Sequence, residues 1–119
     1  MPTLVVPAFE NLTREEFWRS FIAANDFRHL AEIGVWRGGF ASYLLRHCGC
    51  IESYTMIDAW RNLPNWNKPY NVDQNEFDAV FNEAMSATDF AAAKRMVKRG
   101  TTLEVISEIP DLSLDFVIS

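Results

Sequence analysis

One stretch of this chain, residues 30–60, constrains the fold more than any other. An apolar run leads into residues 32–34, a glycine pair at residues 38–39 opens a predicted helix, and a second apolar run ends at Asp58. Strand, glycine turn, helix, strand and acid, in this order, are typical of a parallel α/β sheet that binds a ligand at the carboxyl ends of its strands.

Strands and helices alternate along the rest of the chain, which also predicts a parallel sheet. Residues 91–97 fit either a short strand or a helix. Three helices are predicted to begin at a capping residue followed three positions later by Glu, namely Thr13 with Glu16, Asp73 with Glu76 and Thr101 with Glu104. The predicted strands are residues 28–33, 53–57, 96–97 and 114–118.

The glycine turn does not match the common phosphate-binding turns. A dinucleotide turn has glycine at the position of Trp36, where the backbone must approach a pyrophosphate closely. A P-loop has Lys followed by Ser or Thr after the last glycine, whereas this chain has Phe40 and Ala41. Both phosphate interpretations are therefore weak.

Two acids favour a ligand without phosphate. A carboxylate at Glu32, near the end of the first strand, repels phosphate and suits a ligand that carries an ammonium and a sulfonium group. The acid at Asp58 suits a ribose diol, because a carboxylate accepts hydrogen bonds from both hydroxyls. S-adenosylmethionine combines these features.

Three segments resemble class I S-adenosylmethionine-dependent methyltransferases, and the likeness covers residues 28–119. Residues 32–39, Glu-Ile-Gly-Val-Trp-Arg-Gly-Gly, resemble the family's first motif, and residues 54–60 resemble its second-strand motif. The run at residues 112–118 is similar to the approach to its fourth strand. The closest likeness is to the small-molecule O-methyltransferase type.

The resemblance implies a Rossmann-like three-layer sandwich with strand order 3-2-1-4, formed by one domain, residues 1–119, in which residues 1–27 are a helical lead-in. Family domains continue to seven strands, so the chain is expected to be truncated after its fourth strand. The last strand would then leave an open edge, so the chain is expected either to form a homo-oligomer through that edge or to be only marginally stable. The family's metal-binding or catalytic acid and the histidine after it fall outside the chain.

The pattern and the resemblance together predict the cofactor-binding residues Glu32, Gly34, Gly38, Asp58, Ala59, Trp60 and Thr101. Asp58 either binds the ribose or only caps a helix or loop, and Glu32 either meets the cofactor or is a solvated acid at the strand end. Trp60 either stacks on adenine or packs under the loop that follows. The two glycines either contact the cofactor or only permit the turn, and Thr101 either meets adenine or only caps a helix. No catalytic residue is assigned. Residues 59–72 hold Trp66, Tyr70 and four asparagines. They form a flap over the adenosine, a wall of the acceptor pocket or a polar surface crossover.

Charge and cysteine usage exclude several classes of protein. The net charge of −5 argues against nucleic acid as a partner, and the basic residues at positions 94–99 are interpreted as the solvated flanks of a short apolar segment. No apolar stretch approaches the ~20 residues of a membrane span. Cys48 and Cys50 match no zinc pattern, so no metal is predicted, and Gly49 between them is predicted to cap a helix. A cytoplasmic protein is expected.

Two functions follow as hypotheses. The first is an S-adenosylmethionine-dependent methyltransferase that acts on the oxygen or nitrogen of a small-molecule acceptor, although this 119-residue chain alone is expected to be inactive. The second is a non-catalytic module that binds an adenosyl ligand. An NAD-binding domain is the weakest alternative because of Trp36.

Overall fold

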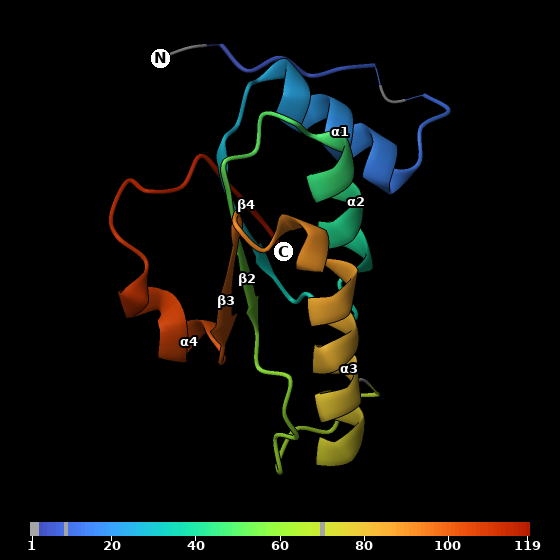
Figure 1. Ribbon diagram of the computed structural model, residues 1–119, viewed down its shortest axis with the longest axis vertical. Coiled ribbons are helices and arrows are strands. Elements are labelled where there is room, and N and C mark those ends of the chain that lie inside the picture. The colour runs from blue at the N-terminus through green and yellow to red at the C-terminus, as the bar shows by residue number, and fades with distance from the viewer. Residues whose placement is uncertain (1–2, 9, 70) are drawn as a thin grey trace.

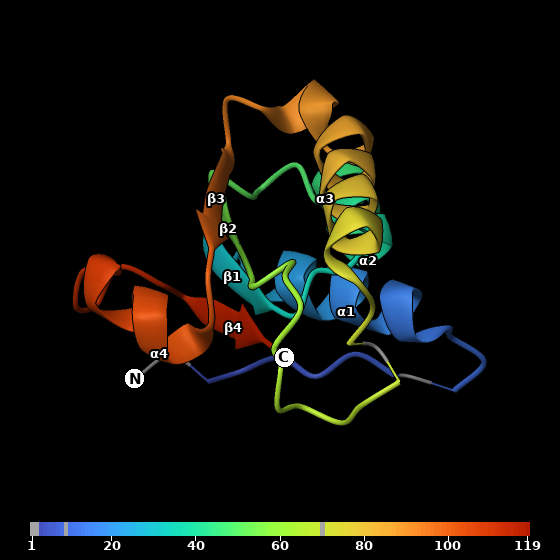
Figure 2. The same cartoon turned by 90° about the horizontal axis from the view of Figure 1, so that it is seen from below.

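The sheet has the predicted architecture. The computed structural model describes residues 3–8, 10–69 and 71–119. Its four strands are all parallel and lie in the order β3-β2-β1-β4, which confirms the predicted α/β fold and strand order. Figure 1 shows the sheet nearly edge-on, and Figure 2 shows the four labelled strands in this order. The strands are β1 (His29–Ile33), β2 (Ser53–Asp58), β3 (Arg95–Arg99) and β4 (Phe116–Ile118).

The two faces of the sheet are covered unequally. Helices α1, α2 and α3 lie on one face, and the short α4 lies on the other (Figure 2). Two single 3₁₀ turns, η1 and η2, complete the described elements. The bounds are α1 (Arg14–Ala24), α2 (Gly39–His47), α3 (Gln74–Ala87), η1 (Asp89–Ala91), α4 (Thr102–Val105) and η2 (Ile106–Glu108).

The main core lies between the sheet and the three helices. Leu30, Tyr54 and Met56 point into it from the strands and are fully buried, and Ile22 and Leu44 meet them from α1 and α2. The opposite face holds a smaller cluster, formed by Ala31, Ile57 and Val105. Residues of both faces are buried in β1 and β2, which explains why these strands appear as continuous apolar runs.

Helix starts follow the capping chemistry of the sequence. Thr13 and Thr101 each form a full capping box with the Glu three residues later. At α3 the Asp73 carboxylate accepts a hydrogen bond from the N–H of Glu76 at 2.8 Å. Among the described contacts, this is the only half of the predicted capping box that forms. The predicted helix over residues 14–24 is confirmed.

Three local predictions need correction. Arg95 and Arg99 belong to β3 and do not merely flank it, and both donate hydrogen bonds to α3 or its C-cap; Arg95 is partly buried, whereas Arg99 is exposed. The fourth strand begins later than expected, since Asp115 turns its carboxylate onto the N–H groups of Arg28 and His29. Gly49 follows the C-cap Cys48 without a left-handed φ, so it does not adopt the conformation of a glycine cap.

Among the described strands, β4 pairs with β1 alone and forms one edge of the sheet. Val117 on this strand is 46% exposed. Self-association through this edge stays a prediction. In the part of the chain that the structure describes, none of the helices is both long and apolar enough to cross a membrane.

Candidate functional site

The site begins with Asp58, the last residue of β2. Its Oδ2 accepts a hydrogen bond from the N–H of Trp36 at 2.8 Å, and its Oδ1 accepts one from the N–H of Trp60 at 3.0 Å. The Asp58 carboxylate therefore connects the turn after β1 and the loop after β2 by hydrogen bonds. A carboxylate offers about four acceptor positions, so Asp58 can accept further hydrogen bonds.

Both of these tryptophans have left-handed backbone conformations. The φ angle is +58° at Trp36 and +44° at Trp60, in a region that residues with a Cβ atom rarely adopt. The indole N–H of Trp60 donates to the carbonyl of Trp36 at 2.8 Å. Backbone strain of this kind persists only where surrounding contacts enforce it, and it concentrates at functional sites.

A cavity of about 370 Å³ opens beside Asp58 at the carboxyl edge of β1 and β2. This volume lies within the range of small-molecule sites, which are largely apolar with few polar groups. Trp66 is 49% exposed, whereas Trp60 has no exposed surface. The lining is mainly aromatic and aliphatic, and it consists of Gly34, Trp36, Asp58, Ala59, Trp60, Arg61, Leu63, Trp66 and Phe77.

Four of the predicted cofactor-binding residues meet at this cavity: Gly34, Asp58, Ala59 and Trp60. Gly34 has a φ of +88°, and a Cβ atom built on it would have no neighbour within 4 Å. Its surroundings are therefore open to a ligand. Of the two alternatives for Trp60, packing is the one that this conformation satisfies, because the indole is fully buried and lies 5.0 Å from the Phe81 ring.

Gly38 and Thr101 do not line the cavity. Gly38 has a φ of +82°, and a Cβ atom built there would lie 3.0 Å from the Cα atom of Ala84. Its lack of a side chain permits both the turn and the packing of α3. Thr101 caps α4, and the Glu104 carboxylate that completes this cap also pairs with Arg61 of the cavity at 2.9 Å.

Glu32 is the predicted residue whose environment differs most from expectation. It lies one position before the end of β1, and it is 4% exposed on the face covered by the helices, not open at the strand end. Tyr54 donates its O–H to Glu32 at 2.7 Å. Burial raises the pKa of Glu32 to about 7, although the Tyr54 hydrogen bond and Arg14 oppose the rise. Burial and the neighbouring Glu32 also raise the pKa of Tyr54.

The turn after β1 is poorly suited to phosphate. The N–H of Trp36 is directed at the carboxylate of Asp58, and the N–H of Gly38 donates to the carbonyl of Val35 at 3.1 Å. A glycine turn binds phosphate when its backbone N–H groups point at the ligand and no carboxylate lies next to them. The geometry thus agrees with the weakness of both phosphate interpretations.

Two lining residues, Trp36 and Phe77, were not predicted to contact a ligand. Arg61, Leu63 and Trp66 lie in the loop over residues 59–72 that was predicted either to cover the ligand or to cross the surface. The loop that carries Trp66 is ordered by the side chain of Asn71, which bonds the N–H and carbonyl of Leu63 and the carbonyl of Trp66. The sequence signal for this was the asparagine content of residues 59–72. Tyr70 lies outside the described residues.

The opposite, amino edge of the sheet carries a polar cluster beside a second cavity of about 540 Å³. His29 Nδ1 lies 2.8 Å from Ser53 Oγ, and His29 Nε2 lies 3.4 Å from a carboxylate oxygen of Glu52. His29 and Glu52 are 43% and 54% exposed. Contacts this open to water contribute little energy.

The cysteines form no cross-link. Cys48 is buried, which raises the pKa of its thiol to about 11, and Cys50 is partly buried. Among the residues that the structure describes, no three His, Cys, Asp or Glu side chains lie close enough together to hold a metal ion.

Comparisons with protein-family models, with curated proteins and with solved structures give no match for this chain. The geometry at the carboxyl edge is therefore the basis for any functional conclusion.

Proposed function

We propose that the chain is the adenosyl-binding part of a cytoplasmic S-adenosylmethionine-dependent methyltransferase that acts on the oxygen or nitrogen of a small-molecule acceptor. One observation carries the proposal. Asp58, whose carboxylate can accept further hydrogen bonds, lies at an apolar cavity where Gly34 leaves space for a ligand.

The chemistry of an adenosyl ligand fits this cavity in three respects. The ribose diol supplies two O–H donors for the remaining acceptor positions of Asp58. The adenine ring is planar and largely apolar, and Trp66 offers a half-exposed aromatic face for it. The ligand carries no phosphate, so the carboxylate beside the turn does not repel it.

The contribution of this chain to methyl transfer would be binding and orientation. When bound, S-adenosylmethionine supplies a methyl group to an oxygen or nitrogen of the acceptor. Asp58 and the turn at Gly34 would fix the donor on one side of the cavity, which removes much of the entropic barrier to transfer. The largely apolar lining would keep water away from the reacting atoms.

The second candidate, a non-catalytic adenosyl-binding module, also has an observation in its favour. Of the described residues that line the cavity, only Asp58 and Arg61 carry a charged side chain. Asp58 is bonded to two backbone N–H groups and Arg61 is paired with Glu104. Neither is placed as a general base. Formation of S-adenosylhomocysteine in the presence of phenol, catechol and amine acceptors would favour the methyltransferase.

Calorimetric titration of the folded chain with S-adenosylhomocysteine, S-adenosylmethionine and NAD tests ligand binding. We expect Asp58→Ala to weaken adenosyl binding at least about tenfold, because a charge-assisted hydrogen bond contributes roughly 1.5–3 kcal/mol. If Asp58→Ala does not fold, Asp58→Asn retains one acceptor and serves in its place.

Asp115→Ala is the matched control. Asp115 also fastens two backbone N–H groups, those of Arg28 and His29 at 2.8 and 2.9 Å, but it does so at the amino edge. Its loss should leave adenosyl affinity unchanged. The proposal fails if NAD binds more tightly than either adenosyl ligand, or if the two aspartate variants have equal effects on affinity.

A further inference from the structure

We propose that Arg99 is a positioning residue for the adenosyl site. It holds the backbone carbonyl of Trp60 in place and thereby keeps the carboxylate of Asp58 oriented toward the cavity. This inference rests on the proposed function and adds to it a residue that does not line the cavity. Arg99 ends β3, the strand next to β2.

The guanidinium group of Arg99 joins three elements around the cavity. Its Nη2 donates to the carbonyl oxygen of Trp60 at 2.9 Å and to Oδ1 of Asp78 in α3 at 2.8 Å. The side chains of Arg99 and Asp78 are 37% and 55% exposed, so the partly buried bond to Trp60 is the one on which the proposal depends. The guanidinium group lies 4.3 Å from the ring centroid of Phe81, also in α3. A planar guanidinium can stack and donate in two directions at once, which an ammonium group cannot.

Trp60 is therefore held at both ends of its backbone. Its N–H donates to Asp58, its carbonyl accepts from Arg99, and its indole donates to Trp36. These bonds enforce a left-handed φ of +44° that a tryptophan does not adopt readily. Release of the carbonyl would let the residue relax toward an ordinary conformation and would turn its N–H away from Asp58.

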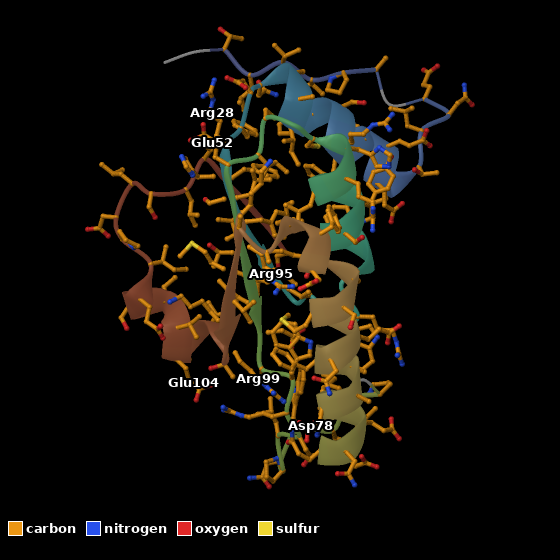
Figure 3. The ribbon with its side chains drawn as sticks, viewed as in Figure 1. Arg28, Glu52, Asp78, Arg95, Arg99 and Glu104 are labelled. Atoms are coloured by element: carbon orange, nitrogen blue, oxygen red, sulfur yellow. The ribbon has the colours of Figure 1, made fainter. Side chains whose placement is uncertain are left out.

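A second side chain reinforces the arrangement. Gln74 at the start of α3 donates to the carbonyl of Trp60 at 3.4 Å and to Asp78 at 3.0 Å, and it accepts from the N–H of Asn62 at 3.2 Å. The hydrogen bonds from Gln74 and from Arg99 lower the pKa of Asp78, so the partner of Arg99 stays ionised. Figure 3 shows Arg99 beside Asp78 at this end of the molecule.

Arg95 provides an internal control within the same strand. It begins β3, and its Nη1 donates to the carbonyl of Met85 at 2.8 Å and to Oγ1 of Thr88 at 2.9 Å. Arg95 therefore also links β3 to α3, but at the opposite end of the strand from Arg99 (Figure 3), and it does not line the cavity. A purely structural role for Arg99 would make the two arginines equivalent.

The test compares Arg99→Met with Arg95→Met by thermal unfolding and by calorimetric titration with S-adenosylhomocysteine. Both variants should unfold at a lower temperature. Arg99→Met alone should weaken binding, by about tenfold, which lies within the range of couplings between residues in contact. Arg99→Lys should give an intermediate loss, because lysine keeps the charge and N–H donors but has a shorter side chain and cannot stack on Phe81 as a planar guanidinium does. If Arg99→Met does not fold, Arg99→Lys and Asp78→Asn are compared with Arg95→Lys.

Each outcome is decisive. Equal affinities of the Arg99 and Arg95 variants would overturn the positioning role while leaving the proposed function intact. A wild-type chain that does not bind S-adenosylhomocysteine would overturn the proposed function, and the positioning role with it. Loss of binding in the Arg99 variants alone would support both.

Discussion

At each edge of the sheet, an aspartate and an arginine restrain the backbone by hydrogen bonds, but the consequences differ between the two edges. At the carboxyl edge, Asp58 fastens two backbone N–H groups and Arg99 ties β3 to α3. At the amino edge, Asp115 fastens two backbone N–H groups and Arg95 ties β3 to the end of α3. At the carboxyl edge the bonds of Asp58 hold two tryptophans with left-handed φ angles beside an apolar cavity, whereas the bonds of Asp115 hold Arg28 and His29, which have ordinary φ angles. The residue types alone therefore do not mark a site; the backbone that they restrain does.

The largest expected effect concerns the packing that holds the carboxyl edge together. Trp60→Ala should lower the free energy of unfolding by about 3–5 kcal/mol, because it empties a fully buried site and removes the bond to Trp36. Trp66→Ala in the same loop should change it by no more than about 0.5 kcal/mol, since Trp66 is half exposed. Urea unfolding of both variants measures the difference. Comparable losses would mean that the strained backbone is not held by the core.

The next expected effect is a change in the free energy of unfolding with pH, which distinguishes a buried acid from an exposed one. Glu32 has a folded-state pKa of about 7, above its ordinary value of 4.5. The folded state therefore binds the proton more tightly, and the stability that this contributes is full below pH 4.5 and is lost as the pH rises through 7. Each pKa unit corresponds to about 1.4 kcal/mol, so the stability of the wild type relative to Glu32→Gln should fall by about 3 kcal/mol between pH 4.5 and 8.

Denaturant unfolding at several pH values checks this expectation. The variant Glu52→Gln at the amino edge is the control, because Glu52 is exposed and its replacement should change stability by no more than about 0.5 kcal/mol. A wild-type curve parallel to that of Glu32→Gln would show that Glu32 is not buried as described.

The smallest effects distinguish the glycines of the two edges. Gly38→Ala should cost about 1–3 kcal/mol, because the left-handed conformation is strained for alanine and the new Cβ meets the backbone of Ala84. Gly34→Ala should cost about 1 kcal/mol from the backbone strain alone, since no atom lies near its Cβ position. Gly49→Ala, at the other end of α2, should cost nothing measurable. Thermal unfolding ranks the three variants, and any other order would contradict the assigned roles.

Local chemistry made much of the fold predictable. The capping residues Thr13 and Thr101 each act through a partner three positions away, so sequence spacing alone located two helix starts. The apolar runs of β1 and β2 are buried on both faces, and alternation with helices implied parallel pairing. The position of Asp58 at the carboxyl edge followed from that pairing.

What the sequence could not predict depends on contacts between distant residues. The burial of Glu32 requires Tyr54, which lies 22 positions away, and the requirement for glycine at position 38 comes from α3. Arg99 reaches a carbonyl 39 positions earlier in the chain. None of these partners leaves a periodic or spaced signal. The same holds for Trp60, whose aromatic character suited stacking and packing equally.

The cluster of aromatic side chains at the cavity also has an optical consequence. Three of the four tryptophans in the chain, Trp36, Trp60 and Trp66, line that cavity, and Trp18 lies on α1. Indole fluorescence responds to local polarity and is quenched by a stacked purine. Three of the four indole groups therefore lie beside a single cavity, so a ligand that enters it is expected to alter the intrinsic emission without any added dye.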